Sequence, residues 1–363
     1  MRILHIIQEL GRGGAERSTA TLVDGAKAAG HEVAVVAAAG SFGDAFAIPI
    51  FPMPFVERWP HRLPLAALAV RRATLAWRPD VIHCHNPTMA LATGLAMGRK
   101  RGLPTFVTVH GVADKDYRLT SRILRWLPMP TVACGSGVAA ALREHGLHPL
   151  TIQNGVSPAP PAAARADLER LLPTSGHAKL FLAAGRLATV KNFGLLIRAF
   201  AHLPDAALVI AGEGPLRAEL EREIVRCGVQ SRVALVGYRL DARALMGAAD
   251  GIVITSNWEG LPLVSLEALM DACPIVATRA RWQSEVLTHE HDCLLVEPND
   301  PLALAGSIRR LMDEPDLAAR LSANARLLSL SYTEAGTLAE YLALYRNFAH
   351  RELAWPFLPS AAC

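Results

Sequence analysis

Short apolar runs alternate with helical patterns along almost the whole chain, and this alternation limits the fold more than any other feature. In the first half the runs lie at residues 2–7, 32–37, 80–84, 105–109, 131–133 and 150–152. In the second half they lie near Lys179, Ala207, Val233, Ile252, Ile275 and Cys293. Strands separated by helices pair in parallel, so the pattern predicts an α/β protein built from βαβ units.

The length of the chain indicates more than one domain. At 363 residues it exceeds one ordinary core, and its hydrophobic content of 51% suits buried parallel strands. A segment rich in proline and alanine at 158–166 interrupts the alternation, which restarts at Lys179. We therefore expect a first domain at 1–155, a linker at 156–178, a second domain at 179–332 and a terminal helix with a tail at 333–363.

Neither a membrane span nor a disulfide framework is expected. Arg71-Arg72 interrupt the best apolar stretch, and Gln8-Glu9 end the opening run, which therefore predicts a first strand and not a signal peptide. The six cysteines lie far apart without a Cys-x-x-Cys pair. Buried reduced thiols in a cytoplasmic protein are the expectation.

Two acids eight residues apart, Glu259 and Glu267, follow the apolar run at 251–255. This spacing places Glu259 in a strand-to-helix loop and Glu267 in the first turns of the next helix. Ligands of open α/β sheets sit outside the carboxyl ends of the strands, so both carboxylates are placed to face one polyhydroxylated ligand. Spacing alone is equally compatible with two solvated surface acids.

Arg186 and Lys191 follow the apolar run at 179–184, at another strand-to-helix junction. Two positive side chains beside the amino end of a helix suit a diphosphate, because fixed donors and the helix dipole both favour an anion. A solvated basic turn is the alternative interpretation of this pair.

Taken in order, these motifs make the second half resemble the nucleotide-sugar domain of retaining glycosyltransferases of family 4, which have the two-domain GT-B fold. The motifs that carry the resemblance are Gly185-Arg186-Leu187 with Lys191-Asn192, Ala211-Gly212-Glu213-Gly214-Pro215, Val236-Gly237-Tyr238, Ala248-Ala249-Asp250, Glu259-Gly260 through Glu267-Ala268, Pro274-Ile275-Val276-Ala277-Thr278, and Leu294-Leu295-Val296 with Asp300. The resemblance implies two Rossmann-like, doubly wound domains facing a cleft. It also implies that the helix within 333–363 crosses back to the first, acceptor-binding domain.

The resemblance also implies roles for individual residues of the second half. Arg186 and Lys191 would stabilise the leaving phosphate, and Glu267 would hold the ribose hydroxyls. Glu259 would hold sugar hydroxyls with the backbone amides of Gly260, Leu261 and Leu263, while Pro262 has no amide to offer. The expected catalytic residues are His110, Arg186, Lys191 and Glu259, and the expected donor-binding residues are Gly13, Gly14, Gly237, Tyr238, Gly260, Leu261, Leu263 and Glu267.

A glycine-rich loop at 11–16 follows the first strand and precedes a helix. A dinucleotide fingerprint would need a third glycine where Glu16 stands, and an acid where Ala37-Ala38-Ala39 end the second strand, so a dehydrogenase is not expected. The resemblance places Gly13 and Gly14 close to the donor phosphate and Glu16 close to the acceptor. A purely structural turn is the alternative.

Two histidine motifs end neighbouring strands of the first half. His83 and His85 share one strand face, which is compatible with a metal pair, but no further ligand falls at metal-site spacing. His110 matches a family histidine that contacts the donor sugar, and His85 is expected to border the cleft. The triplet Asp114-Lys115-Asp116 has a manganese-binding form that belongs to a different glycosyltransferase fold, so we expect no metal.

The expected activity is therefore transfer of a sugar from a nucleotide-diphosphate sugar, UDP- or GDP-linked, to a hydroxyl of a glycan, a lipid-linked or a small-molecule acceptor. The family pattern implies retention by front-face transfer without a cofactor or metal. A catalytically inactive sugar-nucleotide-binding subunit, or a GT-B epimerase or phosphorylase, are the alternatives. One departure from the family is Arg281-Trp282, where the family usually has Gly-Gly, and this leaves the donor sugar undefined.

Charge is distributed unevenly between the two halves. Residues 1–150 hold 17 Lys and Arg against 10 Asp and Glu, whereas the whole chain has a net charge of +4. Within this half, residues 55–78 combine arginines with tryptophans and leucines, a pattern typical of an interfacial helix. We therefore expect weak peripheral attachment to the inner face of the plasma membrane, as in polysaccharide or glycolipid biosynthesis, although a helix packed on its own sheet would show the same pattern. Nucleic acid is not an expected partner.

Overall fold

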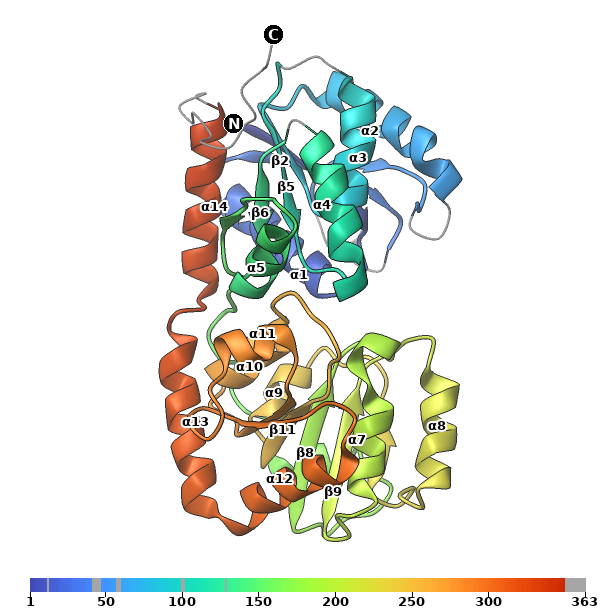
Figure 1. Ribbon diagram of the computed structural model, residues 1–363, viewed down its shortest axis with the longest axis vertical. Helices are drawn as coiled ribbons and strands as arrows, with labels where there is room; N and C mark the ends of the chain where they lie inside the picture. Colours follow the sequence, from blue (N-terminus) through green and yellow to red (C-terminus); the bar gives the residue numbers. More distant parts are fainter. Residues whose placement is uncertain (12, 41–46, 57–59, 99–101, 128, 350–363) are drawn as a thin grey trace. The chain divides into compact units, whose positions relative to one another are not determined.

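The computed structural model describes residues 1–11, 13–40, 47–56, 60–98, 102–127 and 129–349, apart from the side chains at 281, 282 and 285. It divides into two compact units (Figure 1). Unit 1 comprises Met1–Asn154 together with Glu334–Cys363, and unit 2 comprises Gly155–Thr333. The terminal helix is thus assigned to unit 1.

Unit 1 contains a seven-stranded parallel sheet among its described residues, in the order β3-β2-β1-β4-β5-β6-β7. Its strands are β1 (Arg2–Glu9), β2 (Glu32–Ala38), β3 (Ile50–Pro52), β4 (Val81–Cys84), β5 (Thr105–Val109), β6 (Thr131–Ala133) and β7 (Leu150–Thr151). The strand order reverses between β1 and β4. Ligands of doubly wound sheets bind outside the carboxyl ends at such a reversal.

Helices cover both faces of this sheet. The elements are α1 (Gly14–Ala28), η2 (Pro60–Arg62), α2 (Leu63–Trp77), α3 (Pro87–Met97), η3 (Asp114–Asp116), α4 (Tyr117–Trp126), α5 (Ser136–Glu144) and α14 (Glu334–Ala349). On one face Tyr341 and Tyr345 of α14 are buried in a core with Phe106, so this helix belongs to the core of unit 1. On the other face α2 packs against α3, and Thr93 of α3 contacts Cys84.

Unit 2 contains a six-stranded parallel sheet in the order β10-β9-β8-β11-β12-β13 among its described residues. Its strands are β8 (Lys179–Ala184), β9 (Ala206–Ala211), β10 (Val233–Leu235), β11 (Gly251–Ile254), β12 (Ile275–Thr278) and β13 (Leu294–Val296). Its helices are α6 (Arg165–Glu169), η4 (Thr189–Lys191), α7 (Phe193–Phe200), α8 (Arg217–Arg226), α9 (Ala242–Met246), α10 (Leu263–Met270), α11 (Arg281–Val286), α12 (Pro301–Asp313) and α13 (Pro315–Ser329). The reversal of strand order lies between β8 and β11. The predicted fold class, two Rossmann-like parallel sheets with helices, is confirmed.

The segment expected as a linker, 156–178, is part of unit 2. It contains α6, where Leu168 is fully buried. Arg165 at the start of α6 donates to Asp250 Oδ2 at 2.8 Å, just before β11. This apolar and ionic anchoring explains why a stretch rich in proline and alanine is ordered against the sheet.

The described cysteines are all free thiols. Cys84, Cys134, Cys273 and Cys293 are buried, and Cys227 is half-buried. Burial raises the pKa of Cys84 and of Cys273 to about 12, so both remain protonated at neutral pH. The expectation of buried free thiols holds for Cys84, Cys134, Cys273 and Cys293 but not for the half-buried Cys227, and Cys363 lies outside the described residues.

Candidate active site

The loops that follow β8 and β11 are joined at the carboxyl edge of the unit 2 sheet, where the strand order reverses. The backbone amide of Asn257 donates to Val190 O at 2.8 Å, and Thr255 Oγ1 donates to Lys191 O at 2.8 Å. The Asn257 side chain adds a bond from Nδ2 to Thr189 O at 3.1 Å. The β11 loop therefore fixes the backbone at Lys191.

Lys191 and Glu259 form an ion pair at this edge. Lys191 Nζ donates to Glu259 Oε1, and Ser256 Oγ donates to the same oxygen at 2.9 Å. Their side chains are only 14% and 16% exposed. Two residues predicted separately from the sequence are thus brought together. The pair is partly shielded from water, which strengthens the attraction between its two charges.

Glycines let the neighbouring loops approach this pair closely. Gly185, with φ of +153°, lies beside Lys191, whose Cε would be 2.8 Å from a Cβ at this position. A Cβ at Gly212 would lie 1.8 Å from Gly185 O, so no side chain fits there. Gly212 also donates to Gly237 O at 2.8 Å, and Gly237 has a φ of +74°. The predicted donor-binding Gly237, and Tyr238 after it, therefore lie at the same edge.

Arg186 lies in the same loop as Lys191, and its side chain is exposed. Within the part of the chain that the structure describes, no hydrogen bond or ion pair engages its guanidinium. A cation held beside Lys191 without an internal carboxylate is available to an anion from solution.

The second predicted acid, Glu267, is buried in α10, with an exposed fraction of 3%. Gly260 and Leu261 are buried before the helix, and Leu263 begins it after Pro262 at the N-cap position. One turn beyond Glu267, Asp271 pairs with Arg243 at 2.9 Å, and burial raises the pKa of Asp271. Glu267 therefore lies in a polar, largely buried environment.

In unit 1, the glycine-rich loop forms the amino end of α1. Gly13 is the N-cap and Gly14 begins the helix. A Cβ at Gly13 would lie 2.2 Å from Glu16 Oε2, so the Glu16 carboxylate folds back over the start of the helix. Glu16 thus occupies the position where the helix dipole favours negative charge. Arg12 lies outside the described residues.

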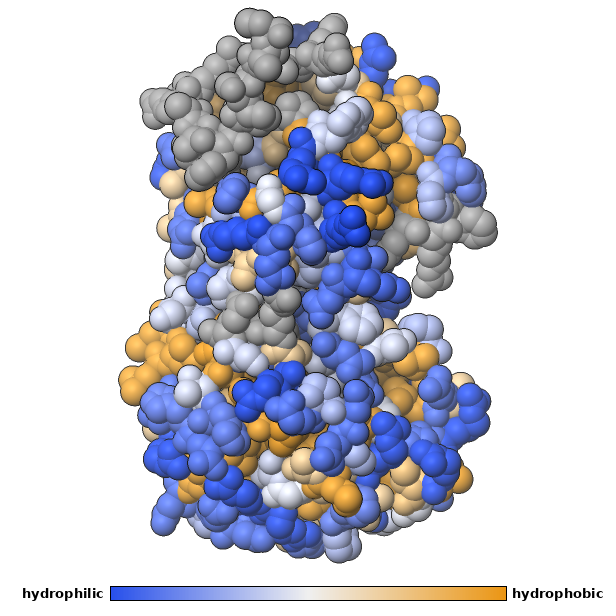
Figure 2. Space-filling model, in the orientation of Figure 1, coloured by the Kyte–Doolittle hydropathy of each residue, from blue (hydrophilic) through white to orange (hydrophobic). Residues whose placement is uncertain are grey.

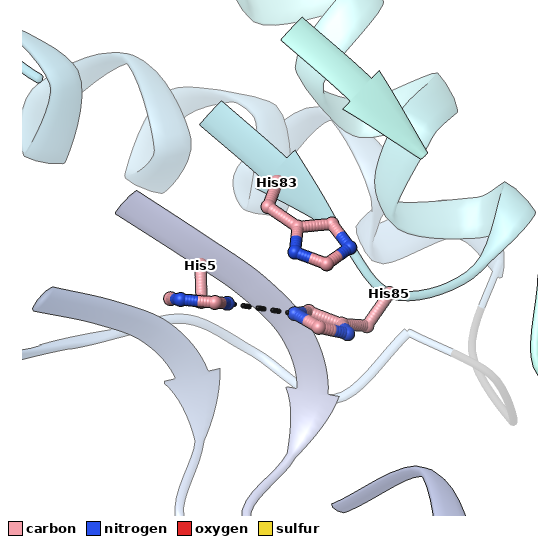
Figure 3. Close-up of side chains that lie close together, drawn as sticks. All are labelled: His5, His83 and His85. Atoms are coloured by element: carbon pink, nitrogen blue, oxygen red, sulfur yellow. Dashed lines mark hydrogen bonds between the residues drawn. The ribbon is translucent and has the colours of Figure 1, made fainter. Parts of the chain in front are cut away.

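Unit 1 contains a buried histidine cluster. His5 lies on β1 and His83 on β4, and His85 and His110 directly follow β4 and β5. Figure 3 shows His5, His83 and His85 gathered on one face, with a hydrogen bond between His5 and His85. His5 Nδ1 lies 2.8 Å from His85 Nε2, and His85 Nδ1 lies 3.2 Å from His110 Nε2. His83 contacts Tyr345 and Thr108 instead, both at 2.8 Å.

His85, which was expected to border the cleft, is buried within unit 1. Its exposed fraction is 1%, because His5, His83 and His110 surround its ring. At the carboxyl edge of the sheet its ring contacts His110, and its expected place beside the cleft stays a prediction. His5 was not predicted as a site residue, because it lies inside an apolar strand. Its place in the cluster follows from its register with His83 of the neighbouring strand.

Burial keeps this cluster neutral. It lowers the pKa of His5 to about 3 and of His110 to about 4, and it lowers the pKa values of His83 and His85 well below the ordinary value of 6.5. Neighbouring histidines lower the last two further. At neutral pH each ring therefore has one N–H group that donates and one bare nitrogen that accepts a hydrogen bond.

The cluster fits hydrogen bonding better than a metal ion. Ring nitrogens of His5, His83 and His85 lie within 4.8 Å of one another, a grouping that could hold zinc. Two nitrogen ligands at zinc bond lengths of about 2.0 Å would be about 3.3 Å apart, which is longer than the 2.8 Å between His5 and His85. Both nitrogens of His83 are already bonded to hydroxyl groups.

Comparison with known families covers most of the chain. The family described as Glycosyl transferases group 1 matches residues 168–328, and Glycosyltransferase Family 4 matches residues 12–159. These ranges contain the Lys191–Glu259 pair and the histidine cluster apart from His5.

Individual proteins agree with this assignment. The lipopolysaccharide core biosynthesis glycosyltransferase LpsD of Rhizobium meliloti (strain 1021) is 32% identical over 295 residues, covering 78% of this chain and 83% of the relative. The UDP-Gal:alpha-D-GlcNAc-diphosphoundecaprenol alpha-1,3-galactosyltransferase of Escherichia coli is 27% identical over 259 residues, covering 65% and 67%. Anabaena Alr3699/HepE, crystallised with UDP and glucose, has the same fold, with a TM-score of 0.82, 22% identity and coverage of 95% and 99%. The chain therefore belongs to the group 1 glycosyltransferases of family 4, and it is a transferase enzyme.

Proposed function

We propose that this enzyme transfers a sugar from a nucleotide-diphosphate sugar to a hydroxyl group, with retention of configuration at the anomeric carbon. The observation that carries the proposal is the Lys191–Glu259 pair at the reversal of strand order in unit 2, with the exposed Arg186 in the same loop. Cations at the carboxyl edge of a doubly wound sheet suit a diphosphate.

The roles of the two cations follow from the charge that develops during the reaction. When the bond from sugar to diphosphate breaks, negative charge grows on the leaving phosphate. Fixed donors aimed at that charge lower the barrier, because they need no reorganisation. Lys191 is held by Glu259 and by the bond of its own carbonyl to Thr255, whereas Arg186 is free to move onto the phosphate.

Glu259 has two tasks in this proposal. It orients the Lys191 ammonium, and it accepts hydrogen bonds from sugar hydroxyls together with the amides of the loop into α10. Glu267 binds the ribose hydroxyls. We further propose front-face transfer without a metal, in which the leaving phosphate takes the proton of the acceptor hydroxyl. Arg186 and Lys191 supply the positive charge that a metal would otherwise bring.

For the donor we propose a UDP-sugar first and a GDP-sugar second. The names of the Escherichia coli relative and of the Anabaena complex both contain UDP, which supports uridine. Binding of a panel of UDP- and GDP-sugars, followed by turnover with glycan and lipid-linked acceptors, tests the function. Failure of every nucleotide sugar to bind would refute it.

We propose that unit 1 docks on an anionic membrane through α2 to reach a lipid-linked acceptor. The helix buries small residues, including Ala66, Ala67 and Ala73, and leaves Leu65 and Leu75 58% and 67% exposed. This arrangement is the reverse of an ordinary amphipathic helix, which buries its large apolar side chains. Figure 2 shows hydrophobic surface over α2 and α3.

Basic side chains accompany these leucines. Arg71 and Arg72 of α2 are exposed, and α4 adds Trp126, 72% exposed, among exposed arginines. Trp77 is instead engaged by Arg2, whose guanidinium carbon lies 4.4 Å from its ring centre. Each basic residue near an anionic surface contributes about 1 kcal/mol, so a few give weak, salt-sensitive attachment. In the described residues no helix is both long and apolar enough to cross a bilayer.

Co-sedimentation with vesicles tests the docking. The wild type should bind anionic but not neutral vesicles, and Arg71→Glu with Arg72→Glu should abolish binding. Arg143→Glu with Arg222→Glu is the matched control, because it makes the same change in net charge at exposed positions on α5 and α8. Equal loss in both double variants, or no binding at low salt, would remove the membrane from the proposal.

A further inference from the structure

We propose that His5 and His85 are positioning residues that hold His110 in the tautomer with its proton on Nδ1, ready to donate to an oxygen of the bound substrate. The three rings form one continuous chain of contacts, from His5 Nδ1 to His85 Nε2 and from His85 Nδ1 to His110 Nε2. The inference rests on the proposed function only for the identity of that substrate. We call this chain the histidine relay.

The strands of unit 1 dictate where the relay runs. His5 lies in the middle of β1, paired in register with His83 of β4. His85 directly follows β4, and His110 directly follows β5. Because β1, β4 and β5 are neighbours in the sheet, the relay runs from the buried middle of the sheet to its carboxyl edge. That edge is where doubly wound sheets bind ligands.

Counting protons leaves two arrangements. A neutral imidazole has one N–H and one bare nitrogen, and each contact between two rings needs one of each. If His5 Nδ1 carries a proton, then His85 accepts on Nε2 and donates from Nδ1, and His110 accepts on Nε2 and keeps its proton on Nδ1. In the reverse arrangement all three protons sit on Nε2. The tautomers of the three rings are therefore coupled.

The inner end of the relay favours the first arrangement. His5 Nε2 is buried, and no hydrogen-bond partner lies near it among the residues that the structure describes. The reverse arrangement would leave a buried N–H there without an acceptor, which is rare and costly in folded proteins. The first arrangement leaves only a lone pair unpaired at this inner end and places the unpaired N–H on His110 Nδ1, at the carboxyl edge of the sheet, where an oxygen of a substrate can accept it. The buried Nε2 of His5 thus determines which nitrogen of His110 carries the proton.

The outer end then presents a donor. His110 Nδ1 is also buried and without a partner within the described part of the chain, although the residue as a whole is half-buried. With its proton fixed on Nδ1, His110 can give a hydrogen bond to an incoming oxygen but cannot accept one at that atom. Tautomer control of this kind acts through another residue, so His5 needs no contact with the substrate.

Nitrogen NMR of the full-length protein tests the relay without any substrate. With ¹⁵N-labelled histidine at pH 7, the signals of His5, His85 and His110 are assigned by single substitutions. All three rings should show a protonated Nδ1 and a bare Nε2, the opposite of the form that neutral histidine prefers in water. Protons on Nε2 in His85 and His110, or a charged ring in the relay, would overturn the proposal.

Two variants of His5 separate the relay from simple packing. Asparagine keeps an N–H donor near the position of Nδ1 but is smaller, whereas leucine fills more of the space and has no donor. The relay predicts that His5→Asn retains the Nδ1 tautomer of His110, while His5→Leu yields mixed tautomers. With the fastest donor of the nucleotide-sugar panel, kcat should fall about tenfold or more in His5→Leu and less than about threefold in His5→Asn.

Packing alone predicts the opposite order, with the smaller asparagine more damaging. His83→Leu is the matched control, because His83 is equally buried beside the relay but bonds to Tyr345 and Thr108. It should lower the melting temperature and leave the tautomer of His110 unchanged. A change of that tautomer in His83→Leu would overturn the assignment to His5 and His85.

A metal measurement completes the test. Elemental analysis of the purified protein should find no zinc in stoichiometric amount, and stoichiometric zinc that is lost on His5→Leu would overturn the relay. If no nucleotide sugar is turned over, the proposed function fails while the NMR result still decides the relay. If turnover occurs but the tautomers are reversed, the relay fails while the function stands.

Discussion

Replacing Lys191 by methionine should remove most of the catalytic power and leave the fold intact. The variant keeps the length and much of the apolar contact of the side chain but removes the ammonium that lies against Glu259. The backbone of residue 191 stays anchored, since Thr255 bonds to its carbonyl and Asn257 bonds to Val190. A fall in activity of the variant would therefore result from the loss of the positive charge and not from a rearranged loop.

The structure indicates the size of both effects. Loss of one donor aimed at developing charge typically lowers kcat about a hundredfold, or about 2.7 kcal/mol of barrier. For stability, the 14% and 16% exposures place the pair between surface pairs, worth at most about 1 kcal/mol, and buried pairs, whose disruption costs about 3–5 kcal/mol. We expect a loss of about 1–3 kcal/mol, because Ser256 still bonds to Glu259.

The assay compares initial rates and thermal unfolding of Lys191→Met with those of Lys179→Met. Lys179 begins β8, at the end opposite to the loop that carries Lys191; its Nζ pairs with Asp250 at 3.2 Å and its side chain is 36% exposed. Asp250 keeps Arg165 as a partner, so the control should retain kcat within about twofold and lose less than about 1 kcal/mol. Equal kcat values in the two variants, or a lower value for Lys179→Met, would refute the role given to Lys191.

Three further predictions follow from the same geometry. Glu267→Gln should raise KM for the donor about tenfold or more with kcat little changed, because the ribose is bound equally in the ground and transition states. Steady-state kinetics checks this, and a fall in kcat as large as the expected rise in KM would contradict it. Transfer should persist in excess EDTA, and loss that manganese restores would show that a metal takes part. The stability of unit 1 should fall as pH drops below about 6.5, because burial lowers the pKa values of His5, His83, His85 and His110. Only the unfolded chain then takes up their protons, so the free energy of unfolding falls by up to about 1.4 kcal/mol per pH unit for each ring. Chemical denaturation at pH 7.5 and 5.0 checks this, and equal midpoints would contradict it.

In the second unit the sequence predicts where the candidate site residues lie, because they follow the ends of strands. Lys191 and Glu259 each follow an apolar run, and the carboxyl ends of parallel strands share one edge of the sheet. Their direct pairing could not be predicted, since it needs β8 and β11 to be neighbours although β9 and β10 lie between them in the chain. The sequence pattern does not report strand order.

The first unit shows where the sequence is less informative. The strand β3 has only three residues, in a stretch that Pro49, Pro52 and Pro54 interrupt, so it was not expected. The burial of His85 was not predicted, because strand alternation indicates the face on which a side chain lies but not what covers that face. Tyr341 and Tyr345 lie more than two hundred residues from the histidines in the chain, and only the return of α14 brings them together.

The central claim is that this enzyme transfers a sugar from a nucleotide-diphosphate sugar with retention. Proton NMR of the glycoside formed from an α-linked UDP-sugar tests it most directly, because the anomeric coupling constant of the new glycosidic bond reports its configuration. We predict an α-linked product and a rate of formation about a hundredfold lower in Lys191→Met. A β-linked product, or no turnover of any UDP- or GDP-sugar by the wild type, would contradict the claim.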